Sequence, residues 1–196
     1  MITLTNLFNR NSKGRYSEDK ARELKLLAKE SIGVNNPAIA TQIKYIINQL
    51  YLLETQIKSI DNDIKQIMDK LNSPILTVPG IGYTLGAIII SEIGDITRFS
   101  NPSKLLAFAG LDPSVKQSGN FNANTTRISK RGSKYLRYAI YRAAFIIIYN
   151  NEQFYKYYTA KRAEGKSHYN AIGHVSGKLV KIIYKILSDN IPFKLS

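Results

Sequence analysis

Ser118 lies in a long stretch of the chain where a hydroxyl would be surrounded by positive charge. Residues 113–151 contain no Asp or Glu. The basic residues in this stretch are Lys116, Arg127, Lys130, Arg131, Lys134, Arg137 and Arg142. Such a segment attracts phosphate, and its cations would stabilise an alkoxide and a pentacovalent phosphorus. No His or carboxylate lies near Ser118 in sequence to activate it, so on the residues alone a surface-loop serine is the simpler interpretation.

The glycine turn at residues 79–82 is a second candidate site. Apolar residues precede Pro79-Gly80-Ile81-Gly82, and a second apolar run follows it. Glycine permits the positive φ of a sharp turn, so the pattern predicts a helix–hairpin–helix. In that motif the backbone amides of Gly80, Ile81 and Gly82 would hold a phosphate at the start of the second helix. An ordinary helical corner without a phosphate site is the alternative interpretation of these four residues.

A long helix is predicted before these candidate sites. Asn36-Pro37 is a helix-start signal. Apolar residues then recur at alternating spacings of four and three, and we call this set the seam: Ile39, Ile43, Ile46, Leu50, Leu53, Ile57, Ile60, Ile64, Ile67 and Leu71. The pattern predicts a coiled-coil helix about 50 Å long. Its narrow stripe favours pairing with a second copy through residues 39–71, and a partner helix within the same chain is the alternative.

The full pattern predicts an all-α protein in three parts. Residues 1–36 form a lead with a short helix, residues 37–72 the coiled-coil helix, and residues 73–196 a compact helical domain that contains the helix–hairpin–helix. Start and stop signals within the last part predict helices that begin near Pro102, Ser133, Glu152 and Ser167. Residues 111–127 lack periodicity and are predicted to form a long loop with room for a short hairpin.

The charge of the chain favours a polyanionic partner. The net charge is +14. Residues 75–196 hold 17 Lys and Arg against 6 Asp and Glu, whereas residues 1–74 hold 11 against 8. The basic half is therefore the expected nucleic-acid surface, and an anionic lipid surface is the competing interpretation. The longest apolar run, residues 143–149, is too short to span a bilayer, and no signal peptide is visible. We expect a cytoplasmic, nucleoid-associated protein.

The residue types that bind metals or form disulfides are scarce or scattered. The chain has no cysteine, so it has neither disulfides nor thiolate chemistry. His168 and His174 are six residues apart, a spacing that does not place both on one face of a helix for chelation. The carboxylates of the basic half are dispersed, whereas two-metal phosphoryl transfer needs several that converge. We therefore predict no metal site and no cofactor within this chain.

The order of the motifs resembles a known family. The motifs are Pro79–Gly82, Glu92–Ile96 with Arg98-Phe99, Ala109–Pro113, Gln117–Gly119, Ile128–Gly132, Leu136-Arg137 and Ala143-Ala144. Through these motifs, residues 75–160 resemble the C-terminal Transposase 20 domain of the insertion-sequence 110/116/902 transposases. Several motifs in one order are more specific than any one of them.

This resemblance implies a role for Ser118 that the residues alone do not. In the family, the serine of the matching motif attacks a DNA phosphodiester and forms a covalent phosphoserine link, and Gly119 follows Ser118 as the pattern expects. The resemblance also implies that a basic set contacts DNA or a structured guide RNA: Lys116, Arg127, Lys130, Arg131, Lys134 and Arg137.

Full members of the family also carry an N-terminal RuvC-like domain. Its four acidic residues bind Mg²⁺, and we see no matching pattern in this sequence. We therefore expect the C-terminal part of a transposase or recombinase that binds nucleic acid and is inactive in recombination by itself, which leaves open whether the chain alone is an enzyme. The alternatives are a non-catalytic dimeric nucleic-acid-binding module, such as a truncated regulator of a transposase, and a structural coiled-coil adaptor without a nucleic-acid role.

Overall fold

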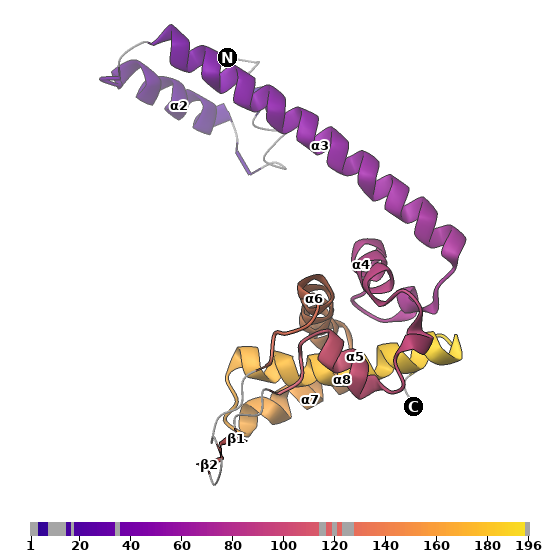
Figure 1. The fold of residues 1–196 in the computed structure, drawn as a ribbon. Helices are drawn as coiled ribbons and strands as arrows, with labels where there is room; N and C mark the ends of the chain where they lie inside the picture. Colours follow the sequence, from indigo (N-terminus) through magenta and orange to yellow (C-terminus); the bar gives the residue numbers. More distant parts are fainter. Residues whose placement is uncertain are drawn as a thin grey trace. The chain divides into compact units, whose positions relative to one another are not determined.

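The computed structural model describes residues 4–7, 15–16, 18–33, 36–113, 117–118, 121–122 and 128–194. This part of the chain is predominantly helical, which confirms the all-α prediction (Figure 1). The chain divides into two compact units, residues 1–53 and 54–196. The boundary falls inside the longest helix, and the predicted three-part division at residues 36 and 72 stays a prediction.

The first unit contains α2 (Glu18–Glu30) and the beginning of α3 (Pro37–Leu71). The Asn36 side chain accepts a hydrogen bond from the Ala38 N–H over 3.0 Å, so it caps α3 where the sequence predicts a start. The helix α3 has 35 residues and ends at Leu71, one residue before its predicted end. The prediction of one long helix is therefore confirmed, whereas its pairing as a coiled coil stays a prediction.

The second unit contains the remaining elements. They are η1 (Pro74–Thr77), α4 (Tyr83–Ile93), η2 (Ile96–Arg98), α5 (Pro102–Phe108), α6 (Lys134–Asn150), α7 (Glu152–Ala163) and α8 (His168–Asp189). Four of these helices have a side-chain cap that accepts a hydrogen bond from a backbone N–H in the first turn: Ser73, Asn101, Ser133 and Ser167. Between α5 and α6 lie β1 (Gln117–Ser118) and β2 (Phe121–Asn122), which pair antiparallel, as the predicted loop allowed.

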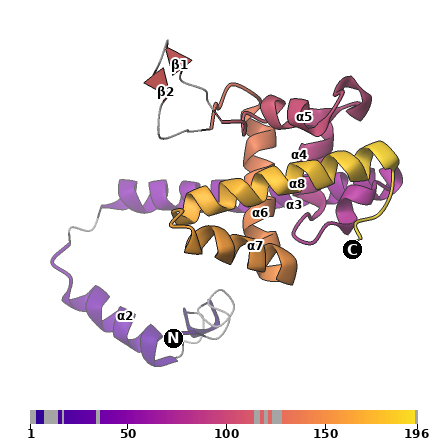
Figure 2. The same ribbon diagram turned by 90° about the horizontal axis from the view of Figure 1, so that it is seen from below.

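The core of the second unit is built around α8. Figure 2 shows α8 crossing α6, with α5 and α7 on opposite sides of α8. Its buried apolar residues recur every three or four positions, and they include Ile172, Val175, Leu179, Ile183 and Ile186. The buried residues of α6 include three alanines, Ala139, Ala143 and Ala144, whose small side chains allow close packing.

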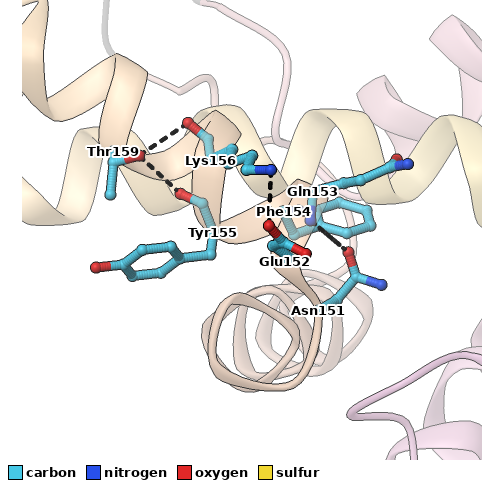
Figure 3. Close-up of polar contacts among 7 residues, drawn as sticks. All are labelled: Asn151, Glu152, Gln153, Phe154, Tyr155, Lys156 and Thr159. Atoms are coloured by element: carbon cyan, nitrogen blue, oxygen red, sulfur yellow. Dashed lines mark hydrogen bonds and ion pairs between the residues drawn. The ribbon is translucent and has the colours of Figure 1, made fainter.

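The start of α7 is fixed by polar contacts within its first turns. The side-chain amide oxygen of Asn151, Oδ1, accepts a hydrogen bond from the Phe154 N–H over 3.1 Å (Figure 3). Glu152 forms an ion pair with Lys156 over 2.7 Å. Phe154 is 1% exposed. The cap therefore holds the backbone of a residue whose ring anchors α7 in the core.

Candidate nucleic-acid interface

The loop over residues 111–128 leaves and re-enters the domain where two backbones cross at glycines. A Cβ atom on Gly132 would lie 1.9 Å from the Phe108 carbonyl oxygen, far inside van der Waals contact. Gly110 has a φ of 63°, and its carbonyl accepts a hydrogen bond from the Lys130 N–H over 3.0 Å. Only glycine fits at this crossing, because any side chain on Gly132 would push the two backbones apart.

Directly beyond the crossing, hydrogen bonds join the two ends of the loop into a neck. Pro113 and Ile128 form an antiparallel bridge. The Ser129 N–H donates to the Asp112 carbonyl over 2.8 Å, and the Ser129 hydroxyl donates to the Asp112 carboxylate. Ser129 therefore closes the neck, and Asp112 is its acceptor. The neck determines where the hairpin β1–β2 leaves the domain.

The beginning of α6 is tied to two other helices through Ser133. Its hydroxyl accepts from the Leu136 N–H over 3.0 Å, as expected of an N-cap, and donates to the Glu92 carboxylate of α4 over 2.6 Å. The Ser133 N–H donates to the Phe108 carbonyl of α5 over 2.7 Å. These contacts hold the N-terminus of α6 beside the crossing.

Positive charge gathers at the same end of α6. We call Lys130, Arg131, Lys134 and Arg137 the α6 cation cluster. Lys130, Arg131 and Lys134 are exposed, and none of them pairs with a carboxylate of the described residues. The Arg137 guanidinium donates to the Ala109 carbonyl over 3.2 Å and lies against the crossing. Lys130 precedes the helix and has a φ of 56°.

The electrostatic setting of this cluster is unfavourable without a ligand. The first turn of α6 contains no acidic residue. The N-terminus of a helix carries a partial positive charge, so acidic side chains stabilise it and basic ones do not. A bound phosphate would reverse the sign of this interaction. The arrangement is therefore suited to an anion.

At the glycine turn, one of the three predicted phosphate donors is used within the fold, and phosphate binding there stays a prediction. Gly80 has a φ of 90°, as a sharp turn requires, and the Ile81 N–H is used within the turn, donating to Val78 over 3.0 Å. Gly82 caps α4 without a side-chain hydrogen bond. Within the part of the chain that the structure describes, the N–H groups of residues 83–85 have no hydrogen-bond acceptor. The element before the turn is the short η1, and the helix–hairpin–helix designation stays a prediction.

The glycine turn and the α6 cation cluster lie at opposite ends of the α4–α6 pair. A Cβ atom on Gly80 would lie 3.0 Å from Ile146, near the end of α6, whereas Glu92 near the end of α4 meets Ser133 at the start of α6. The two helices are therefore antiparallel. With 11 residues in α4, the two patches are about 16 Å apart along its axis. One phosphate cannot contact both, but a longer nucleic acid can.

The predicted nucleophile lies only partly within the described structure. The backbone of Ser118 belongs to β1, where it pairs with Phe121. The side chain of Ser118 lies outside the described part, as do Lys116, Gly119 and Arg127. The catalytic role of Ser118 and the contacts of these residues with nucleic acid therefore stay predictions.

The carboxylates near this interface do not fit a Mg²⁺ site. Glu92 and Asp112 accept hydrogen bonds from serines. Asp95 accepts from the Thr97 N–H over 2.8 Å, and this hydrogen bond holds the pKa of Asp95 below its ordinary value. No group of three His, Asp or Glu residues within the described ranges could hold a metal ion. The predicted absence of a metal or cofactor in this chain stays a prediction.

The sequence did not reveal how α3 is joined to α4. Met68 is 2% exposed, and a Cβ atom on Gly86 would lie 3.2 Å from its methyl group. The Tyr83 hydroxyl donates to the Asp69 carboxylate over 2.7 Å, a hydrogen bond that raises the pKa of Tyr83. The Lys65 ammonium lies 5.8 Å from the centre of the Tyr83 ring. A buried methionine just outside the apolar seam was the available signal.

Most of the seam remains uncovered along α3. Nine of its ten residues are 52–63% exposed, and Ile64 is partly buried against the core of the second unit. A helix face this apolar is stabilised by a partner that removes it from water. Within the described ranges, no helix is both long enough and apolar enough to cross a membrane.

Comparison with known proteins gives this surface a family context. Residues 72–159 match the Transposase IS116/IS110/IS902 family. The chain is 27% identical over 154 residues to the 43.6 kDa protein of insertion element IS110 from Streptomyces coelicolor, an alignment that covers 78% of this chain and 36% of that protein.

Two further relatives are a pilin gene-inverting protein and a transposase. The pilin gene-inverting protein of Moraxella bovis is 31% identical over 144 residues, covering 70% of this chain and 45% of that protein. The transposase for insertion sequence element IS1111A of Coxiella burnetii is 30% identical over 115 residues, covering 57% and 31%. The chain spans less than half the length of each of these three relatives.

Proposed function

We propose that this chain acts in DNA recombination as part of an insertion-sequence transposase. The reason is that residues 72–159 match the Transposase IS116/IS110/IS902 family. The role of the chain is to bind DNA, together with a structured guide RNA, and to supply the Ser118 hydroxyl for strand exchange. The observation that carries this proposal is the α6 cation cluster, which gathers unpaired cations at the positive end of a helix beside the neck of the Ser118 loop.

In the proposed reaction Ser118 attacks a DNA phosphodiester. A bond forms between the serine Oγ and phosphorus as the bond between phosphorus and the departing deoxyribose oxygen breaks. The serine proton passes to water, and the leaving oxygen takes up a proton from water. The product is a phosphoserine diester, which conserves the energy of the phosphodiester for rejoining to a second DNA end.

The contribution of this chain is positional and electrostatic. The glycine crossing and the neck determine where the hairpin leaves the domain, and therefore the region that Ser118 can reach. The α6 cation cluster would neutralise the phosphate and the charge that develops on it. Because the described carboxylates do not form a Mg²⁺ site, we derive no metal-assisted step here. We expect that ion in a RuvC-like domain like that of full family members.

We also propose that two copies associate through the seam on α3. Its support is the 52–63% exposure of nine large apolar side chains at alternating spacings of four and three. Burying the exposed half of each Ile or Leu contributes about 1 kcal/mol, so the two copies together offset the entropy of association. Pairing would bring two serine loops into one assembly.

The test uses a complete transposase that carries this chain, with Ser118→Ala and the matched loop variant Ser114→Ala. We expect Ser118→Ala to lower the rate of strand exchange by at least ~10³-fold and to remove the covalent protein–DNA adduct, while duplex binding persists. Ser114→Ala should retain all three. Unchanged strand exchange in Ser118→Ala would refute the nucleophile. DNA binding without any adduct in the parent protein would favour the non-catalytic module, and an absence of binding at low salt would favour the adaptor.

A further inference from the structure

A second basic surface lies on α8, away from the residues that the sequence selected. Lys178, Lys181 and Lys185 are exposed and follow one another at spacings of three and four, which places them on one face of the helix. We call them the α8 lysine row. The other sides of α8 are occupied by α5, α6 and α7 (Figure 2). The row therefore lies on the side of α8 that faces solvent.

The lysines of the row differ from those of the neighbouring helix α7. On α7, Lys156 pairs with Glu152 (Figure 3) and Lys161 pairs with Glu164, each over 2.7 Å. Within the described ranges no carboxylate pairs with any lysine of the row. The two lysines of α7 are thus neutralised within the protein, whereas those of the row are available to an external anion.

One ammonium of the row is held in place by aromatic rings. The Lys178 Nζ atom lies 4.9 Å from the centre of the Tyr157 ring and 5.5 Å from that of Phe154. The Phe154 ring is buried, and the Asn151 cap fixes its backbone (Figure 3). An ammonium oriented in this way loses less side-chain entropy on binding an anion than a free lysine does.

The surface around the row suits a sugar-phosphate backbone better than unpaired bases. Gly173 and Gly177 lie on the same helix, and a Cβ atom at either would meet nothing within 4 Å, so a ligand can approach the backbone closely. Tyr184 is the ring residue between Lys178 and Lys185 on α8; it is partly buried, and its hydroxyl donates to the Phe99 carbonyl over 3.0 Å. No exposed ring of α8 lies between the three lysines to stack on a base.

We propose that the α8 lysine row is a second DNA-contacting surface, which binds the backbone of a DNA duplex independently of base sequence. The inference rests on the proposed function, which supplies DNA as the polyanion. The row spans about 10 Å along α8, and one DNA strand presents a phosphate every ~3.4 Å of helix axis, so the row reaches two or three phosphates. Together with the α6 cation cluster it would contact DNA at two separate places.

The test measures duplex DNA binding by the full chain as a function of salt, with fluorescence anisotropy. The row variant carries Lys178→Gln, Lys181→Gln and Lys185→Gln. Each lost phosphate contact lowers the slope of log K against log salt by about 0.9, so we expect a decrease of about 2 to 3 and an affinity loss of roughly 10²-fold at 0.1 M salt. A charge-matched control carries Lys29→Gln, Lys44→Gln and Lys58→Gln, exposed lysines of α2 and α3, and should keep the parent slope.

A second row variant guards against a loss of folding. Replacement of the three row lysines by arginine keeps the charge and should keep the slope, with the far-ultraviolet circular dichroism of all variants unchanged. An unchanged slope in the glutamine variant, while the parent chain binds DNA, would overturn this inference and leave the proposed function standing. An equal loss in the charge-matched control, or a loss seen only with single-stranded RNA, would overturn it as well. A parent chain that does not bind duplex at low salt would overturn both proposals.

Discussion

Gly132→Ala is the sharpest single test of the crossing that supports the Ser118 loop. The new methyl group would lie 1.9 Å from the Phe108 carbonyl oxygen and 2.7 Å from the Gly110 nitrogen. Both are main-chain atoms, so no side chain can rotate away to make room. The two backbones must separate by about an ångström or more to restore van der Waals contact.

The cost of that separation follows from the contacts it breaks. The hydrogen bonds from Lys130 to Gly110 and from Ser133 to Phe108, at 3.0 and 2.7 Å, join the two segments that must move apart. Losing them costs about 1 kcal/mol each, and the overpacking costs about 1–3 kcal/mol. The lower entropy of the unfolded alanine chain offsets at most ~1 kcal/mol. Destabilisation therefore prevails, by about 2–5 kcal/mol.

Urea unfolding followed by circular dichroism measures this change, and Gly173→Ala is the matched control. A Cβ atom at Gly173 meets nothing within 4 Å, and alanine is the better helix former by about 1 kcal/mol, so the control should be as stable as the parent or more so. Amide hydrogen exchange should show Lys130 and Ser133 losing protection only in Gly132→Ala. A Gly132→Ala protein within ~0.5 kcal/mol of the parent would refute the close crossing.

Three further outcomes are expected. Leu50→Asp with Leu53→Asp should convert a self-associating chain to a monomer in sedimentation velocity, whereas aspartates on the opposite face of α3 should not. Ser133→Ala removes the cap of α6 and should lower the free energy of unfolding by about 1–2 kcal/mol in urea. The hydrogen bond from the Thr97 N–H lowers the pKa of Asp95, so ionised Asp95 stabilises the folded chain. This contribution to folding stability is complete above the ordinary carboxyl pKa and is lost as the pH falls through the lower pKa of the folded state. An Asp95 carboxyl that titrates by NMR at its ordinary pKa would contradict this.

The helix boundaries could be predicted because their causes are local. Asn101, Ser133 and Ser167 each accept a hydrogen bond from an N–H two or three residues further along the chain. Asn36 does the same before Pro37, whose fixed φ suits the first position of a helix. A capping residue and the helix it starts lie within one turn, so the sequence contains the whole interaction.

The supports of the candidate site could not be predicted, because each joins residues far apart in sequence. Ser133 and Glu92 are 41 positions apart, and Ser129 and Asp112 are 17 apart. The sequence showed Ser133 as a cap, but its second bond to Glu92 depends on the packing of α4 against α6. Likewise, the lack of space for a side chain at Gly132 arises only when α5 packs beside it. Ser118 was selected by family resemblance and not by any local activating group.

The α6 cation cluster and the seam share one physical feature: neither adds to the folding stability of the isolated chain. Cations at a helix N-terminus oppose the helix dipole by about 0.3–1 kcal/mol each, and apolar side chains exposed along α3 order water without burying area. Other interactions, such as the Ser133 cap and the packing around α8, offset these unfavourable contributions to stability. A nucleic-acid phosphate would remove the unfavourable interaction of the cations with the helix dipole. A second copy of the chain would remove the apolar seam from water. Binding and association should therefore stabilise the chain through different residues, and a charge change in the cluster should leave self-association unaltered.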